Sequence, residues 1–595
     1  MTQYLSPLVD VNEIDLTTTI PAVATSIGVL VIRDSWQGPE LKRQLVNSVD
    51  ELIDVFGRPE TNSFKDILAG TGFLRYGVNL YCTRVLAPSA TFAGVYGTTA
   101  SAGTVTEYTS GNAYQLSDFS SEDSDEFANE STVFDAGRPD FGSEFSIIAK
   151  DRGNYGDYLQ IAYIGRTTYD AIKKGTGTAV SLGISTTLFD DLQQQVDTDF
   201  DTNNELLIVV RKANQENINK SPVPYQLVES MLVSTDPNAV DDGGQNIYAT
   251  NYINQFSQYI RMAVSSTFEN KNMSTVYMAD YSNLGGGVRN QGDTITDADI
   301  IESYELYEDP EIVDVNIFID ADKSDTVKSC LITICESRKD AMAVLDVPYA
   351  TVVNNKGNET SDAIDYRNGL YVGRSLNVNT SYAALYSNWL DIYDKWNAVY
   401  RWIPSSGHAA GIFANTDDVA EAWFAPAGLN RGILQSIRKL AYNPVQGERD
   451  LLYKNGLNPI VSFAGQGKVI YGQKDLLQKN SAFNRINVRR LFIIIGKAVS
   501  TALQYFLFEP NDVFTRLQII NMIDPFLRDV KARRGIFDYL IVCDDRNNTP
   551  ERIDRNELWC DIYIKPTRAA EFIVLNLIAT KTGASFTELV AASTP

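Results

Sequence analysis

The residues that could support catalysis are few in this chain of 595 residues. Its one histidine, His408, ends the segment Pro404-Ser-Ser-Gly-His408, where it follows Ser405 and Ser406. A serine acts as a nucleophile when a neighbouring base activates it, so a Ser–His pair is conceivable here. A single histidine in a loop is more often a structural residue. We therefore interpret His408 as structural and expect no catalytic residues.

The cysteines and the acidic segments lack the spacing that metal sites require. Cys330 and Cys335 lie five positions apart in an expected helix, on different faces, whereas zinc sites need clustered Cys and His. Residues 320–325 resemble a calcium loop, but Asp325 stands where glycine is needed and Leu331 where a bidentate glutamate belongs. The odd, scattered set of cysteines is a poor disulfide framework and is typical of assembly in a reducing cytoplasm: Cys82, Cys330, Cys335, Cys543 and Cys560.

Phosphate-binding and acid–base motifs are incomplete. Gly465-Gln-Gly467-Lys468 lacks the full Walker spacing and the Ser or Thr that should follow it. Asp544 and Asp545 beside Arg546 could form an acid pair, but a capped, salt-bridged loop is the simpler interpretation. The sequence thus predicts no metal, no cofactor and no enzymatic activity.

The net charge of −24 is unevenly distributed. Residues 401–595 carry a net charge of +5, whereas residues 1–400 carry −29, most of it between residues 91 and 314. A basic C-terminal part joined to an acidic remainder indicates two different environments. Acidic surfaces also keep a concentrated protein soluble, and both explanations can hold.

Two basic clusters stand out in the C-terminal part: Arg489-Arg490 and Lys531-Ala-Arg533-Arg534. Interleaved aromatic residues are missing around them and the chain is acidic, so we expect no direct binding of nucleic acid. They are either solvated helix faces or sites that dock to an acidic protein surface. The apolar stretch 491–508 contains Lys497 and Gln504, so it predicts a buried helix rather than a membrane span. Residues 1–15 lack a basic start and an apolar run, so we expect no signal peptide.

Apolar periodicity predicts an α+β or α/β multidomain fold. A strand at 27–32, a capping box at Ser48–Glu51 with a helix ending at Phe56, a helix at 63–76 and a strand at 79–86 form an α/β layout. A strand at 312–319, a helix at 326–338 and a strand at 341–347 predict a further α/β segment, a βαβ unit. These segments predict one α/β middle domain, split into 23–90 and 312–400. Residues 91–311 predict β-rich acidic surface insertion domains, with strands at 145–149, 159–164 and 206–210.

The remaining residues predict an α/β core domain at 401–570 and two extended arms, 1–22 and 571–595. The N-terminal arm alternates loosely in Val9, Val11, Ile14 and Leu16, and the C-terminal arm is apolar on both faces, with Ile573, Leu575 and Leu577. Neither arm has enough apolar surface to fold alone. Each could instead complete a sheet on another subunit.

Several segments of the chain, in order, resemble those of the contractile tail sheath family of myovirus-type bacteriophages. The segments that carry the resemblance are Ala149-Lys-Asp-Arg-Gly-Asn-Tyr-Gly-Asp-Tyr-Leu159, Asp346-Val-Pro348, Ile403-Pro-Ser-Ser-Gly-His-Ala-Ala-Gly411, Ala425-Pro-Ala-Gly428, Asn487-Val-Arg-Arg-Leu-Phe492, Phe508-Glu-Pro-Asn511, Val542-Cys-Asp-Asp-Arg-Asn-Asn-Thr549, Ile564-Lys-Pro566 and Ala570-Glu-Phe-Ile573. Ser405 stands where the family has a proline and Asp157 where it has an asparagine. The insertion region is only thinly covered, so its role is not implied.

The resemblance implies a structural protein of a virion tail, assembled in the host cytoplasm. Such a protein forms a helical homopolymer of stacked six-fold rings around an inner tail tube, and contracts irreversibly to drive the tube through the host envelope for genome delivery. Its implied partners are copies of itself, linked by strand exchange of the termini, the tube protein, and baseplate and tail terminator proteins. The basic residues Arg489, Arg490, Lys531, Arg533 and Arg534 would then face the tube or a neighbour. The alternatives are a tail adhesin or glycan-degrading tail protein, or another structural tail or baseplate component.

Overall fold

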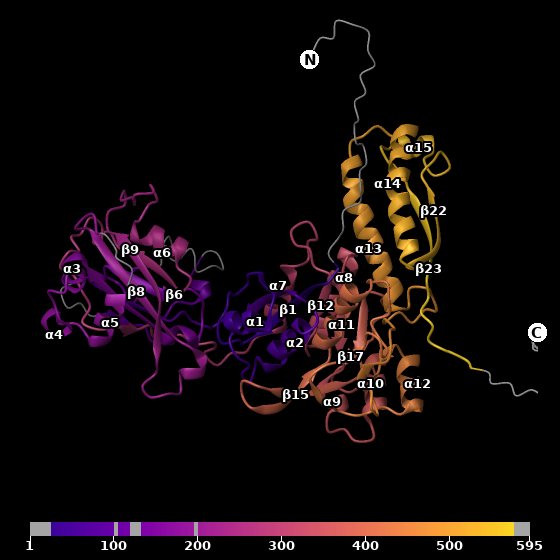
Figure 1. Ribbon diagram of the computed structural model, residues 1–595, viewed down its shortest axis with the longest axis horizontal. Helices are drawn as coiled ribbons and strands as arrows, with labels where there is room; N and C mark the ends of the chain where they lie inside the picture. The colour runs from indigo at the N-terminus through magenta and orange to yellow at the C-terminus, as the bar shows by residue number, and fades with distance from the viewer. Residues whose placement is uncertain (1–24, 100–104, 120–132, 195–199, 576–595) are drawn as a thin grey trace, which may run out of the picture. The chain divides into compact units, whose positions relative to one another are not determined.

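The computed structural model describes residues 25–99, 105–119, 133–194 and 200–575 (Figure 1). The chain divides into two compact units, with the division between Tyr505 and Phe506. Helices and strands occur together in both units, and the larger unit contains several separate sheets. The predicted α+β multidomain fold class is confirmed.

The larger unit is built on a seven-stranded sheet. Its strands, in order across the sheet, are β19 (Leu457–Asn458), β14 (Ala383–Tyr386), β13 (Met342–Asp346), β12 (Ile317–Ile319), β1 (Ile27–Arg33), β3 (Asn79–Val85) and β2 (Gln44–Val46). Neighbouring strands are parallel except β2, which pairs antiparallel with β3. Segments on both sides of residues 91–311 therefore build one sheet.

Helices cover both faces of this sheet, and successive residues of β1 point to opposite cores. Leu30 and Ile32 pack with α1 (Val49–Phe56), α2 (Phe64–Leu74) and α11 (Ser406–Val419). Val29 and Val31 pack with α7 (Asp297–Glu305) and α8 (Asp325–Arg338). A strand buried on both faces reads as a continuous apolar run, which is why residues 27–32 show no alternation.

At the start of α1, half of the predicted capping box forms, since the Glu51 side chain accepts from the backbone N–H of Asn47 in place of that of Ser48. The Ser48 hydroxyl accepts a hydrogen bond from the Glu51 backbone N–H at 3.1 Å, and Gly57 ends the helix with φ of +84°. The expected strand at 312–319 is shorter, because only β12 joins the ladder. Val313 and Val315 alternate into the core without belonging to a strand.

Between residues 94 and 283 the strands form two antiparallel four-stranded sheets, which confirms the β-rich texture of this region. The first contains β10 (Ile260–Val264), β6 (Phe145–Ala149), β4 (Gly94–Gly97) and β5 (Val105–Glu107), and the second β11 (Ser282–Asn283), β7 (Leu159–Gly165), β8 (Glu205–Ala213) and β9 (Tyr225–Ser234). The described part of this region also contains the helices α3 (Arg166–Lys173), α4 (Ala179–Leu182), α5 (Thr186–Gln194) and α6 (Ala249–Phe256).

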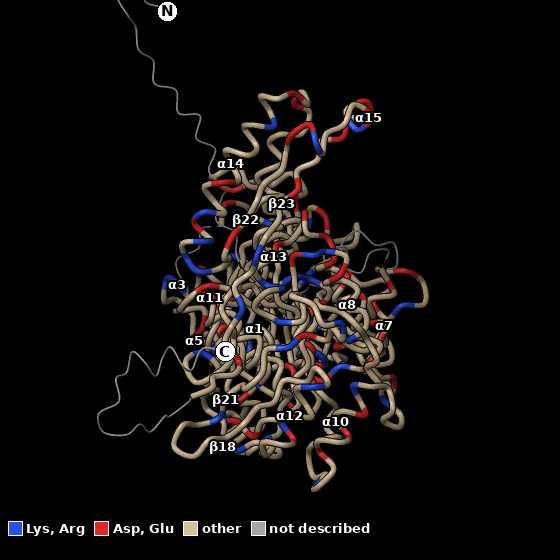
Figure 2. The backbone as a smooth tube through the Cα atoms, turned by 90° about the vertical axis from the view of Figure 1, so that its right-hand side faces the viewer, with Lys and Arg blue, Asp and Glu red and all other residues tan. Residues whose placement is uncertain are grey.

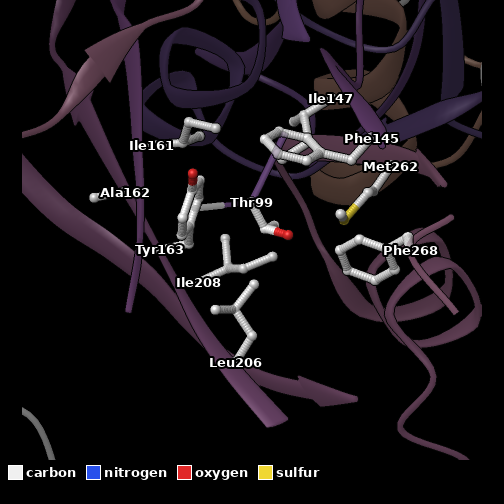
Figure 3. Close-up of a pocket in the computed structure, with 10 residues that line it drawn as sticks. All are labelled: Thr99, Phe145, Ile147, Ile161, Ala162, Tyr163, Leu206, Ile208, Met262 and Phe268. Carbon is white, nitrogen blue, oxygen red and sulfur yellow. The ribbon is translucent and has the colours of Figure 1, made fainter. Parts of the chain in front are cut away.

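These two sheets share one apolar core. Figure 3 shows a cavity inside it, where Phe145, Tyr163 and Ile208 converge. Its volume is about 10 Å³, which is room for about one water molecule and far below the volume of a ligand pocket. The cavity is a packing defect and not a binding site.

The structure differs from the predicted domain boundary at residue 400. Strands β15 (Trp389–Asp394) and β16 (Val399–Pro404) form a hairpin across it, and β19 and α11 belong to the large sheet and its cover. The local sequence pattern does not reveal that the two-residue strand β19 forms the edge of the seven-stranded sheet, beside β14. The other elements of this part are α9 (Tyr349–Val352), α10 (Glu359–Asn368), β17 (Ile433–Leu434), β18 (Ile437–Leu440), α12 (Gln446–Lys454), β20 (Ile460–Phe463), β21 (Gly467–Ile470) and α13 (Ile486–Leu503).

The smaller unit contains a long helix beside a two-stranded hairpin. Its elements are α14 (Val513–Ala532), β22 (Ile536–Val542), α15 (Pro550–Ile553) and β23 (Asp561–Pro566). Figure 1 shows α14 running alongside β22 and β23. In the part of the chain that the structure describes, no helix is long and apolar enough to cross a membrane.

Helices α2 and α11 approach each other closely because glycines lie at their contact. A Cβ atom on Gly407 would lie 2.1 Å from the carbonyl oxygen of Ala69, and one on Gly411 would lie 2.6 Å from the Tyr76 ring. On α2, a Cβ atom on Gly72 would lie 2.4 Å from Nδ1 of His408. The glycine-rich segment 403–411 is therefore a helix-packing motif.

We expect Gly407→Ala to lower the free energy of unfolding by about 1–3 kcal/mol, because the methyl group collides with backbone atoms that cannot move aside. The matched control is Gly496→Ala on α13, where the added Cβ meets no atom within 4 Å. There alanine should raise the free energy of unfolding by about 0.5–1 kcal/mol through helix propensity. Urea unfolding followed by circular dichroism measures both values. Equal effects of the two variants would contradict the close-packing account.

Candidate inter-subunit site

The hairpin of the smaller unit has open edges. Among the described residues, β22 and β23 pair only with each other. An isolated two-stranded sheet is at best marginally stable, and the outer edge of each strand presents backbone N–H and C=O groups that can pair with another chain. The hairpin therefore presents edges to which a further strand could be added.

Helix α14 supports this hairpin and leaves apolar side chains exposed beside it. Ile519, Ile523 and Leu527 of α14 are buried, and the Tyr539 hydroxyl donates to Oδ1 of Asp524 at 2.7 Å. By contrast, exposed large apolar side chains in this unit occur on both elements: Val513, Phe514, Leu517, Phe537, Leu540 and Tyr563. These side chains leave apolar area on the surface of this unit open to contact.

The chain after β23 continues without a helix or strand as far as residue 575. Four consecutive apolar residues there are almost fully exposed: Phe572 at 85%, Ile573 at 87%, Val574 at 82% and Leu575 at 78%. Two of the predicted arm residues, Ile573 and Leu575, are thus unpartnered apolar groups within the described residues. The others, Val9, Val11, Ile14, Leu16 and Leu577, lie outside the described residues.

Three of the predicted basic residues lie exposed at one end of the hairpin. Lys531, Arg533 and Arg534 follow one another at the end of α14, close to where Gly535 accepts a hydrogen bond from Thr567 at 3.1 Å. Lys531 pairs with Asp538 at 3.0 Å and Arg533 with Asp529 at 3.0 Å. Such exposed pairs contribute little to stability, so these cations remain able to bind an acidic surface. Near the other end, residues of both signs surround α15 (Figure 2).

The structure places Arg489 and Arg490 against partners in the same subunit, where the sequence predicted a tube- or neighbour-facing position. Arg490 is 5% exposed, and its Nη2 atom lies 2.7 and 2.6 Å from the two carboxylate oxygens of Asp417. Arg489 stacks over the rings of Tyr382 and Phe483, and burial lowers its pKa. Asp417, which neutralises the charge of Arg490, lies 73 residues away in the sequence. A local sequence pattern could not reveal this pairing.

The conceivable Ser–His pair does not form. Ser405 donates a hydrogen bond to Oδ1 of Asp346 at 3.0 Å, and the Ser406 hydroxyl accepts one from Ala321 N–H. His408 is fully buried, and neither of its ring nitrogens has a hydrogen-bond partner among the described residues. Burial, with a smaller contribution from Arg75, lowers the pKa of His408 to about 3. His408 is a neutral core residue of α11, whereas the sequence pattern predicted a structural histidine in a loop.

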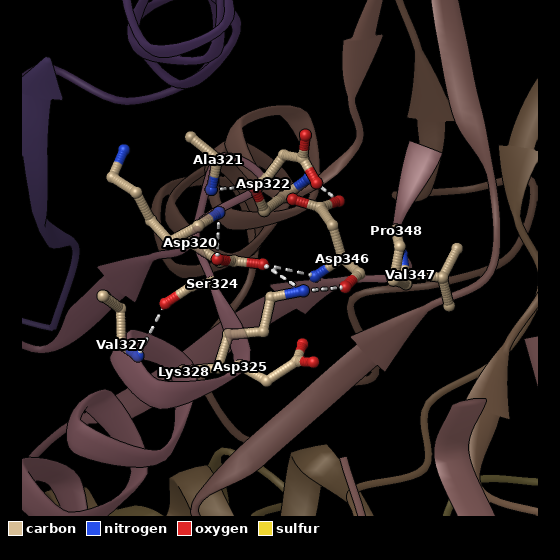
Figure 4. A network of polar contacts seen from close by, with 12 residues as sticks. Asp320, Ala321, Asp322, Ser324, Asp325, Val327, Lys328, Asp346, Val347 and Pro348 are labelled. Carbon is tan, nitrogen blue, oxygen red and sulfur yellow. Dashed lines mark hydrogen bonds and ion pairs between the residues drawn. The ribbon is translucent and has the colours of Figure 1, made fainter. Parts of the chain in front are cut away.

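A buried network of charges lies at the carboxyl ends of β12 and β13 (Figure 4). Lys328 Nζ lies 3.2 Å from Oδ2 of Asp320 and donates to the carbonyl oxygen of Asp346 at 2.6 Å. Burial and the neighbouring Asp320 raise the pKa of Asp346 to about 7. The network holds β12, β13 and the start of α11 together, since Asp346 also accepts from the Ser406 N–H at 2.8 Å.

A second buried cluster joins β1 to α2. Asp66 accepts two hydrogen bonds from the Arg33 guanidinium at 2.8 Å and one from Lys323 at 2.5 Å. Although burial opposes ionisation, the two cations hold the pKa of Asp66 below its ordinary value. Burial and the repulsion of Arg33 lower the pKa of Lys323 to about 8. Removing one member would leave an unpaired buried charge, so the cluster is structural.

A polar cleft of about 410 Å³ lies next to these residues, at the carboxyl ends of β1 and β3. Ligands bind at this edge in many open α/β sheets. Here the cations that line the cleft are neutralised within the subunit, in the pairs Arg33–Asp66, Lys65–Asp322 and Arg289–Asp34. The cleft therefore presents ion pairs and not a free charge to a ligand.

The other candidate motifs also have structural roles. In the resembled calcium loop, Asp322 pairs with Lys65 and Asp325 with Arg374. The glycines at 465 and 467 form the turn between β20 and β21. Asp544 pairs with Arg546 and Asp545 with Arg516, as the salt-bridged interpretation predicted. Within the described ranges, no group of three or more His, Cys, Asp or Glu residues could hold a metal ion.

Comparisons with known proteins identify the family. Two family models match: the phage tail sheath protein central domain over residues 293–474 and the phage tail sheath C-terminal domain over residues 478–580. A tail sheath protein of Vibrio phage KVP40 is 30% identical over 98% of this chain and 99% of its own length. The chain belongs to the phage tail sheath protein family.

The comparisons found further similar proteins. A tail sheath protein of Enterobacteria phage T4 is 35% identical over 61% of this chain and 56% of its own length. The crystal structure of a sheath tail protein from Listeria innocua covers 92% of this chain and 96% of its own, with a TM-score of 0.50 and 11% identity, and so shares the fold. A sheath complex of an extracellular contractile injection system in its contracted state covers 46% of this chain and 72% of its own, with a TM-score of 0.39 and 23% identity.

We expect Arg490→Glu to destabilise this sheath protein by about 3–5 kcal/mol, because it places two carboxylates together in a buried site. Arg534→Glu, at an exposed position, should change the free energy of unfolding by less than about 0.5 kcal/mol. Chemical unfolding of the unassembled protein measures both. An Arg490→Glu protein as stable as Arg534→Glu would show that the Arg490–Asp417 pair is unimportant for the fold.

The buried His408 should make the protein sensitive to acid. Its pKa is depressed in the fold, so its contribution to stability is complete above pH 6.5 and is lost as the pH falls toward 3. Between pH 7 and pH 4 the wild type should lose about 3 kcal/mol more than His408→Leu. Asp346, whose raised pKa acts in the opposite direction, contributes to both proteins and cancels in this difference. Equal losses in the two proteins would contradict the neutral assignment of His408.

Proposed function

We propose that this protein is the subunit of a contractile tail sheath, which polymerises as stacked six-fold rings around an inner tail tube. Contraction of the sheath would drive the tube through the host envelope to deliver the genome. The observation that carries the proposal is the hairpin of the smaller unit, with two open edges and an exposed apolar arm after β23. Family membership over nearly the full length supports it.

The arms supply the links between subunits in this proposal. Residues 567–575, when extended, span about 30 Å, which is enough to leave one subunit and reach the next. Added to an edge of β22 or β23 of another copy, the arm would pair its backbone groups and bury Ile573 or Leu575 against the exposed apolar side chains there. The predicted N-terminal arm would fill the remaining edge. A heterologous contact of this kind does not close on itself and so generates a helical array.

In this proposal, the positive charge that faces the tube would come from the exposed cations at the end of α14. Lys531, Arg533 and Arg534 remain candidates for contact with the tube or a neighbouring subunit, since their pairs are exposed. Electrostatic contacts at an exposed rim give orientation and fast association with modest affinity. Modest affinity suits a sheath that must release the tube when it contracts.

The role is mechanical and not enzymatic in this proposal. The buried ionisable groups at the carboxyl edge of the sheet are bound to each other, as expected for a rigid body that transmits force. Contraction then requires two packings of the same subunits separated in free energy, stored at assembly. The virion tail is the proposed location. Assembly in the host cytoplasm with baseplate and terminator proteins is consistent with the five free cysteines.

Exposed apolar arm residues provide a sharp test of assembly. Ile573→Asp combined with Leu575→Asp should prevent formation of long tubes seen by electron microscopy, because strand addition would bury the two carboxylates. The control is Val372→Asp, since Val372 is equally exposed at 92% but lies in the larger unit outside the arm. The control should assemble normally, and both proteins should unfold at the wild-type temperature.

A stronger version removes both arms, residues 1–22 and 571–595. This truncated protein should remain a folded monomer at concentrations where the full chain forms sleeves. Sleeves of normal length and contraction from the truncated protein would overturn the linking role of the arms.

A further inference from the structure

Two of the five cysteines are brought together at the loop end of the β22–β23 hairpin. The ladder ends with the pair Val542 and Asp561, so Cys543 and Cys560 occupy the next opposed positions. Beyond them, Asn548 fixes the loop: its amide donates to the Trp559 carbonyl at 2.9 Å, and its side-chain oxygen accepts from the Trp559 N–H at 2.8 Å. The cysteine pair is thus held between a β-ladder and a closed loop.

This position has the geometry that a disulfide needs. Opposed residues of antiparallel strands have Cα atoms about 4.5–5.5 Å apart, inside the range of about 4.4–6.8 Å that disulfides span. The two thiols already share a hydrogen bond. We propose that Cys543 and Cys560 are a redox pair that closes to an intramolecular disulfide when the protein meets a small-molecule disulfide oxidant.

The surroundings of the two sulfur atoms assign them different parts in this reaction. The hydrogen bond from Cys560, assisted by the positive charge of Arg516, lowers the pKa of Cys543, while burial opposes it. Cys543 is 2% exposed, whereas Cys560 is half-buried and can be reached from solvent. The hydrogen bond to Cys543, together with burial, raises the pKa of Cys560, so Cys560 must pass its proton to the Cys543 sulfur when it reacts. Burial alone raises the pKa of Cys82, which makes that thiol the unreactive comparison.

The reaction balances as two thiol–disulfide exchanges. The Cys560 sulfur, after losing its proton, attacks one sulfur of the oxidant, forms a mixed disulfide and releases the first small thiolate. The Cys543 thiolate then attacks the Cys560 sulfur, forms the Cys543–Cys560 bond and releases the second small thiolate. The two small thiolates take up the two protons, so two protein thiols are oxidised and one small disulfide is reduced.

The disulfide would act on the hairpin that accepts the arms, and this consequence rests on the proposed function. Closing the loop between residues 543 and 560 restricts the unfolded hairpin and fixes the spacing of β22 and β23. A reducing cytoplasm would keep the pair open during assembly, and an oxidising medium would close it afterwards. The particle would thereby gain a covalent clamp on its acceptor sheet after release from the cell.

The test uses the dispersed full chain incubated with oxidised glutathione, followed by alkylation, proteolysis and mass spectrometry. We expect a linked peptide pair containing Cys543 and Cys560, with the other three thiols still open to alkylation after denaturation. The single variant Cys543→Ser keeps a hydrogen-bonding group of similar size. It should instead accumulate a glutathione adduct on Cys560, because the second exchange is missing.

Three outcomes would overturn the proposal: both thiols remain free in the wild type, the wild type keeps a stable adduct on Cys560, or Cys330 is the thiol that reacts. Because the reaction is measured on unassembled wild-type protein, its failure is independent of whether the reduced protein forms sleeves. Sleeve formation without the disulfide would leave the proposed function intact. A disulfide in a protein that forms no sleeves would support the redox pair and contradict the proposed function.

Discussion

Backbone hydrogen bonding at the edges of the β22–β23 hairpin is the constraint on which the account of this molecule depends. A strand inside a sheet has partners on both sides, whereas each of these two strands has one partner within the described chain. Within the described residues, their outer N–H and C=O groups have no backbone partner, and apolar side chains beside them are exposed. An extended arm that carries its own apolar side chains is the natural complement. Because that arm leaves the same unit, each copy can donate to one neighbour and accept from another.

The larger unit is closely packed, as the body of a linked array would need to be. Its sheet is covered on both faces, and α11 lies so close to α2 that glycines at the contact are required. The ionised groups at the carboxyl edge are paired with each other, as in the Asp66, Arg33 and Lys323 cluster. Displacing one member of such a cluster leaves a buried charge unpaired, which is unfavourable. Force applied through the arms would then move the unit as a whole.

Sequence reasoning succeeded where the relevant interaction is local. Ser48 and Glu51 cap α1 three residues apart, and the apolar run at 27–32 is a strand buried on both faces. It did not foresee interactions between distant residues. The pairing of Arg490 with Asp417, the joining of β19 to the large sheet and the meeting of Cys543 with Cys560 all depend on a fold that brings separated segments together. The odd number of cysteines argued against a disulfide framework and so against the pairing of Cys543 with Cys560. A count of cysteines carries no information on the register of a hairpin.

Hydrogen–deuterium exchange tests the central claim most directly, because it reports on the backbone groups themselves. Exchange would be compared between the dispersed protein and assembled sleeves, for peptides covering β22 and β23 and for peptides covering β1 and β3 as an internal reference. The account predicts that outer-edge amides of β22 and β23 exchange freely in the dispersed protein and become strongly protected on assembly, while β1 and β3 are protected in both states. Assembly that leaves the hairpin amides exchanging as before would show that its edges are not where subunits join.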